Sequence, residues 1–70
     1  MLNKRLFKST MMLHEDTNIS VSRIIGISPQ RVSAKINALR GAEFTQSEIE
    51  KLKIKWSLTP DEVDAIFFAV

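Results

Sequence analysis

Residues 17–40, TNISVSRIIGISPQRVSAKINALR, decide the fold of this chain. They predict two short helices joined by a tight turn at Gly26, because glycine adopts a positive φ at the least cost. The stretch contains no Asp or Glu, and its basic residues are Arg23, Arg31, Lys35 and Arg40. An amphipathic helix pair with one uncompensated charge sign favours a polyanionic partner. DNA is the expected polyanion.

Local signals set the limits of these two helices. Thr17 is the expected N-cap of a helix that ends near Ile25. Ser28 and Pro29 then predict a second helix start, because Pro at the first helical position loses no hydrogen bond, and this helix is expected to reach about Ala38. Ser22 is the small residue expected where the two helices approach. Apolar residues at helical spacing are expected to hold the pair together, namely Val21, Ile25, Ile27, Val32 and Ile36.

The rest of the chain also follows helical periods. Phe7 and Met11 are four residues apart and predict a helix over about 4–14, with Met11 and Met12 as core residues. Two capping boxes, Thr45 to Glu48 and Thr59 to Glu62, start two further helices. Their predicted buried residues are Ile49, Leu52, Trp56, Val63, Ile66 and Phe67. No segment alternates with period two, so the prediction is a single, compact, all-α domain of five helices over residues 1–70.

Composition excludes several classes of protein. The chain has no cysteine, so neither a disulfide framework nor a thiolate metal site is expected. No apolar run approaches the ~18 residues of a membrane span, and the N-terminus lacks the apolar stretch of a signal peptide, so we expect a cytoplasmic protein. His14 has no partner at metal-ligand spacing. We find no nucleophile and base set, phosphate loop or metal cluster, and therefore expect no enzyme activity, metal or cofactor.

The acidic residues gather away from the helix pair. Asp61, Glu62 and Asp64 lie in residues 59–70, which contain no basic residue. The net charge is only +2, but this placement polarises the molecule. An acidic end of this kind is expected to stay away from phosphates.

Three segments carry a resemblance to a known family. GISPQRVSAKIN resembles the turn and recognition helix of the phage repressors and Cro proteins, the Xre-type helix–turn–helix regulators. EFTQSEIEKLK and LTPDEVDAIFF are similar to the last two helices of small phage regulators of this type. The resemblance implies a lambda-repressor-like five-helix fold, binding of double-stranded operator DNA as a homodimer, and a role in a lysis–lysogeny switch in a bacterial host.

The same resemblance implies which residues contact DNA. Gln30 is the expected base reader, since its amide can pair with adenine in the major groove. Ser33 and Ala34 would face the same groove, while Ser28 and the helix start would meet phosphate. The full set implied for DNA binding is Asn18, Ser28, Pro29, Gln30, Arg31, Ser33, Ala34, Lys35, Asn37 and Arg40.

Two positions depart from the family pattern and favour a protein partner. Asn18 stands where the family usually has a longer glutamine, and Ile19 places an apolar residue where a polar one is usual. Ile54 and Phe68 also fall off their buried stripes. The residues predicted for a protein interface are Ile19, Ile54, Phe67, Phe68 and Val70. The alternative function is therefore an antirepressor that binds a lysogeny repressor protein, and a third interpretation is an antitoxin.

Overall fold

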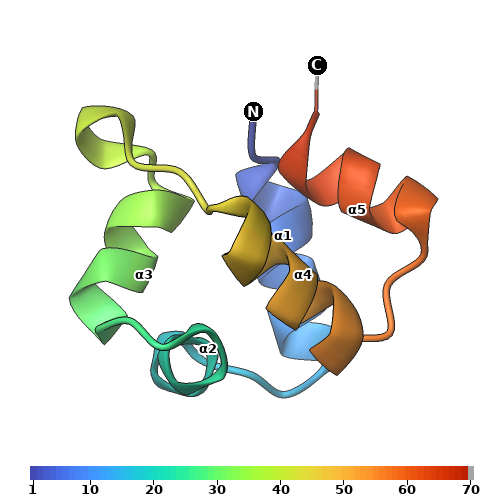
Figure 1. Ribbon diagram of the computed structural model, residues 1–70, viewed down its shortest axis with the longest axis horizontal. Coiled ribbons are helices and arrows are strands. Elements are labelled where there is room, and N and C mark those ends of the chain that lie inside the picture. Colours follow the sequence, from blue (N-terminus) through green and yellow to red (C-terminus); the bar gives the residue numbers. More distant parts are fainter. Residues whose placement is uncertain (70) are drawn as a thin grey trace.

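Five α-helices make up the fold in the computed structural model, which describes residues 1–69 (Figure 1). Their bounds are α1 Lys4–Leu13, α2 Asn18–Ile25, α3 Pro29–Ile36, α4 Gln46–Lys55 and α5 Pro60–Phe67. One turn of 3-10 helix, η1, covers Leu39–Gly41 between α3 and α4. No strand occurs within residues 1–69, so the predicted all-α class is confirmed.

Threonine is the N-cap residue of three of the helices. Thr17, Thr45 and Thr59 each accept a hydrogen bond from the backbone N–H three residues later. Glu48 and Glu62 complete the two predicted capping boxes by accepting from the backbone N–H of Thr45 and Thr59, at 2.9 and 2.8 Å. Each box satisfies two amides that the first helical turn leaves without a partner, so these starts follow from local sequence.

The turn between α2 and α3 is formed as predicted. Gly26 is the C-cap of α2 with φ 78° and ψ 32°, the left-handed conformation. Its N–H donates to the Ser22 carbonyl at 2.8 Å. The predicted end of the next helix was too late, because Ala38 is also left-handed, with φ 52°, and α3 stops at Ile36.

An aromatic cluster forms the centre of the core. Phe7 of α1 is completely buried, and its ring lies 5.6 Å from that of Trp56 and 5.8 Å from that of Phe67. Phe44, in the segment before α4, stacks on Phe7 at 5.1 Å. The cluster therefore joins the first helix to the last two. The predicted core residues that are buried are Phe7, Met11, Val21, Ile25, Val32, Ile36, Ile49, Leu52, Trp56, Ile66 and Phe67, with Val63 half-buried.

Three core assignments differ from the prediction. Met12 is 79% exposed, because it lies about 100° around the helix from Met11 and faces water. Phe44 and Leu58 were missed, although both pack into the core. They lie outside helices, where helical spacing gives no signal.

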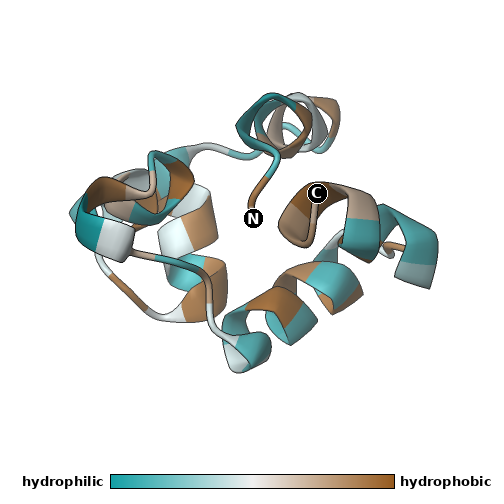
Figure 2. Cartoon of the chain, turned by 90° about the horizontal axis from the view of Figure 1, so that it is seen from above, coloured by the Kyte–Doolittle hydropathy of each residue, from teal (hydrophilic) through white to brown (hydrophobic). Residues whose placement is uncertain are grey.

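The helices form two groups that place α3 and α5 on opposite sides of the molecule (Figures 1 and 2). α2 and α3 pack closely together, and α2 also packs on α4. α1 packs on α5, and the Asn3 N–H donates to the Ile66 carbonyl at 2.7 Å. Every helix carries both hydrophobic and hydrophilic residues (Figure 2), as expected where one face only is buried. Within residues 1–69 we find no helix with the length and apolar character to cross a membrane.

Candidate nucleic-acid interface

The outward face of α3 brings together most of the predicted base-reading residues. Gln30, Ser33, Ala34 and Asn37 are three or four residues apart, so they share one side of the helix. Gln30 and Asn37 are exposed, and Ser33 and Ala34 are half-buried. The face thus presents two amides, Gln30 and Asn37, which can donate and accept hydrogen bonds, with the short side chains of Ser33 and Ala34 between them.

The N-terminus of α3 is built by two residues of the predicted set. Ser28 is the N-cap, and its Oγ accepts from the Arg31 N–H at 3.3 Å. Pro29 occupies the first turn and is half-buried. This arrangement fixes where α3 begins, with Gln30 exposed in its first turn.

Exposed cations occur on α3 and on the two elements next to it in sequence, without acidic neighbours in sequence. Residues 17–42 contain no Asp or Glu. Arg23 lies in the last turn of α2 and Arg31 in α3, and both are exposed. Arg40 is exposed too, but it lies in η1 with φ 53°, beyond the end of α3. The guanidinium groups therefore come from three different elements.

Lys35 was implied to contact DNA, but the structure buries it. It is only 7% exposed, and its Nζ lies 2.6 Å from Glu48 Oε1 of α4. Lys35 follows Val32 by three residues and precedes Ile36, so it occupies the buried arc of α3. Burial would raise the pKa of the Glu48 carboxyl, but hydrogen bonds from Lys35 and from the Thr45 amide hold it below its usual range. Lys35 is therefore an internal residue of the fold.

Asn18 and Asn37, two further predicted DNA contacts, lie at the start of α2 and just after α3. Asn18 is the first residue of α2 and is half-buried beside a shallow hollow that Lys8 and Met12 also border. The Asn37 amide donates to the Ser33 carbonyl at 2.9 Å, so it folds back along α3. Its amide oxygen stays free to accept.

The predicted protein-interface residues differ in exposure. Ile19 is 55% exposed, Ile54 71% and Phe68 45%. Phe67 is 6% exposed and packs in the aromatic cluster, so its assignment to an interface was wrong. Val70 lies outside the described residues.

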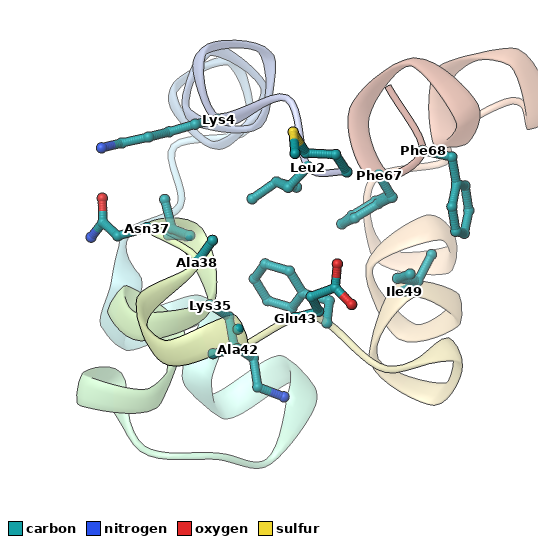
Figure 3. A pocket seen from close by; sticks show the side chains of 14 residues that line it. Leu2, Lys4, Lys35, Asn37, Ala38, Ala42, Glu43, Ile49, Phe67 and Phe68 are labelled. Carbon is teal, nitrogen blue, oxygen red and sulfur yellow. The ribbon is translucent and has the colours of Figure 1, made fainter. Parts of the chain in front are cut away.

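Phe68 borders a hollow of about 720 Å³ between the ends of α1, α3, α4 and α5 (Figure 3). Leu2, Ile49 and Phe67 also line it, whereas Ile54 does not border it. Phe68 and Ile54 therefore do not share this part of the surface.

Sequence reasoning missed two acidic residues that organise the fold. Asp16 accepts the Trp56 indole N–H at 2.7 Å and the Ser20 hydroxyl at 2.8 Å. Burial would raise the pKa of the Asp16 carboxyl, but these two hydrogen bonds hold it below its usual range. Glu48 was assigned only to a cap. The position of Glu48 in the capping box could have predicted that its carboxylate is held in place, but not that Lys35 is its partner.

His14 stacks on Trp56 with ring centroids 5.8 Å apart. Among residues 1–69, no three His, Cys, Asp or Glu side chains are placed to hold a metal ion.

Neither family models, curated protein sequences nor solved structures gave a match to this chain. Its function must therefore be inferred from its own residues.

Proposed function

We propose that this chain is a small transcriptional regulator of phage type that binds operator DNA through α3. The observation that carries the proposal is the outward face of α3, where Gln30 is exposed among short polar side chains. Arg23, Arg31 and Arg40 are exposed on α2, α3 and η1, and no acidic residue occurs in residues 17–42. Such a helix suits the major groove, whose base edges present a distinct hydrogen-bonding pattern for each base pair.

The charge distribution supports the same orientation on DNA. α5 begins with Asp61 and Glu62 in its first turn and lies across the molecule from α3 (Figure 1). Phosphates repel this acidic end and attract Arg23, Arg31 and Arg40. The proposal places the protein in a bacterial cytoplasm, where it represses transcription by occupying the operator, and assigns it no catalytic step.

The test begins with selection of a preferred duplex from random DNA by the purified chain. Gln30→Ala is expected to lose about 1–3 kcal/mol of binding free energy on the selected duplex and to relax preference at one base pair. Arg31→Ala is expected to weaken binding to selected and scrambled duplexes alike. Gln46→Ala, which removes an exposed glutamine from α4, is the matched control and should bind as the wild type does.

Two results would contradict this function. One is a wild-type chain that selects no sequence and does not retard DNA at low salt. The other is Gln30→Ala binding with unchanged affinity and preference, which would remove α3 as the reading element.

A second candidate is an antirepressor that binds a lysogeny repressor protein. Exposed Ile19 favours it, because an apolar side chain at the start of α2 does not suit a phosphate contact. Met12 is a further exposed apolar residue, at 79%, and borders the same shallow hollow as Asn18. Ile19→Gln should then abolish binding to a repressor encoded beside its gene, while leaving DNA binding unchanged or stronger. Co-sedimentation with that repressor distinguishes the two candidates.

A further inference from the structure

The Lys35–Glu48 pair connects the proposed reading helix to α4. It is the only salt bridge within residues 1–69, and its two side chains are 8% and 10% exposed. Glu48 Oε1 also accepts the Thr45 N–H, so the cap of α4 fixes the position of this oxygen. The Lys35 ammonium lies 5.9 Å from the centre of the Phe44 ring, which further confines it.

α3 and α4 are held together mainly through α2, which packs on both, and through the shared core, since their backbones make few direct contacts. Lys35 and Glu48 add a direct polar contact between the two helices. The connecting segment contains three exposed residues with left-handed backbone, Ala38, Arg40 and Gly41. A long lysine side chain spans the gap and ends on a fixed oxygen. The pair therefore restrains the last turn of α3 against α4.

A buried ion pair of this kind is weak evidence for a gain in stability. Replacing such pairs by uncharged residues of similar volume is often neutral or stabilising, because desolvation of both charges offsets their attraction. Directional hydrogen bonding nevertheless selects one geometry. This points to a role in orientation rather than in stability alone.

We propose that Lys35 and Glu48 are positioning residues that set the orientation in which α3 presents Gln30 to DNA, and that Lys35 contacts no phosphate. The inference rests on the proposed DNA-binding function. It assigns sequence preference, rather than overall affinity, to a pair that lies on the side of α3 opposite the DNA.

The experiment uses the double variant Lys35→Met/Glu48→Gln. Met keeps the length of the lysine chain without its charge, and Gln still completes the capping box. Lys51→Met/Glu50→Gln, the same two substitutions at exposed residues of α4, is the matched control and also preserves net charge. Fluorescence anisotropy with the selected and scrambled duplexes over a range of salt gives the preference ratio and the salt slope, and circular dichroism gives Tm.

The double variant is expected to melt near the wild-type temperature and to lose roughly tenfold or more of its preference for the selected duplex. Its affinity for the scrambled duplex and its salt slope should match those of the control. An unchanged preference ratio would overturn the inference. So would a salt slope reduced by about one relative to the control, since that is the mark of a lost phosphate contact.

If the double variant does not fold, the Lys35→Arg variant tests whether the pair orients α3. Arginine keeps a cation opposite Glu48 but changes the length and shape of the connection. Loss of preference with unchanged scrambled-duplex affinity supports the inference, and wild-type preference overturns it. A wild-type chain without any preference would overturn the proposed function and this inference together, whereas preference retained in the variants would overturn this inference alone.

Discussion

At Gly26 the backbone requirement can be separated from packing. The residue has φ +78°, and no neighbouring heavy atom lies within 4 Å of the position that a Cβ would occupy. A side chain at this position is therefore disfavoured by backbone strain and not by a clash. The turn that joins α2 to α3 depends on this conformation.

We predict that Gly26→Val destabilises the fold by about 1–3 kcal/mol, because a β-branched residue tolerates positive φ poorly. In a domain of this size, each kcal/mol lowers Tm by about 4–8 °C. Gly26→Asn is the matched variant, since Asn enters the left-handed region more readily, and its Tm should fall less. Equal melting temperatures for wild type and Gly26→Val would contradict the role given to this glycine.

Single residues also show where sequence reasoning fails. The family resemblance implied a DNA contact for Lys35, yet its spacing from Val32 and Ile36 places it on the buried arc. For this residue, helical periodicity was a better guide to burial than the resemblance. The partner Glu48 is thirteen residues away, and only the folded chain brings the two together.

At the scale of the helix, most of the fold was predictable. The caps at Thr17, Thr45 and Thr59 and the turn at Gly26 depend on neighbouring residues, and all of them formed as expected. The end of α3 was not predictable, because Ala38 adopts a left-handed conformation without the glycine that usually marks one. Phe44 and Leu58 were missed for a similar reason. Both lie in loops, where tertiary packing decides burial and helical spacing does not apply. Helical periodicity also predicts which residues share the outward face of α3, namely Gln30, Ser33, Ala34 and Asn37.

The link between α3 and α4 predicts how stability varies with pH. The pKa of Glu48 lies below its ordinary value of 4.5 in the folded chain. Its contribution to stability is therefore fully present above pH 4.5 and is lost as the pH falls through the lowered folded pKa. At neutral pH, Glu48→Gln leaves Lys35 buried without an opposite charge, and such a change commonly costs about 3–5 kcal/mol.

We predict that the Tm difference between wild type and Glu48→Gln is large at neutral pH and narrows once the pH falls below 4.5. Glu62→Gln is the matched control, because Glu62 completes the same box at α5 but is exposed. Its Tm should stay close to that of the wild type at neutral pH. Melting curves across the acid range test this prediction. A Tm difference between wild type and Glu48→Gln that does not change with pH would show that the charge of Glu48 does not act through Lys35.

At the scale of the whole molecule, the proposed function requires self-association. An operator with two half-sites requires two copies of α3, and a dimer must then use surface apolar residues. Phe68 and Ile54 are the exposed large apolar residues at the end of α5 and on α4. Since Phe68 borders the hollow and Ile54 does not, the two residues need separate tests.

We predict that Phe68→Ser or Ile54→Ser gives a folded chain with weaker self-association, because full burial of one such side chain contributes about 1.5–3 kcal/mol. Leu13→Ser, at a 79% exposed apolar residue of α1, is the control and should associate as the wild type does. Sedimentation velocity measures association, and circular dichroism confirms folding. A monomeric wild type, or both variants associating normally, would contradict the prediction.

The position of Trp56 has an experimental consequence. It is the single tryptophan of the chain, 3% exposed, and it contacts the aromatic cluster through Phe7 and the α1–α2 connection through Asp16. A buried indole emits at a shorter wavelength than one in water, so unfolding will shift the emission to the red. Because the ring is enclosed, a bound duplex will not touch it directly. The chain thus contains its own fluorophore for folding, and a change in its emission on addition of DNA would report a rearrangement of the core.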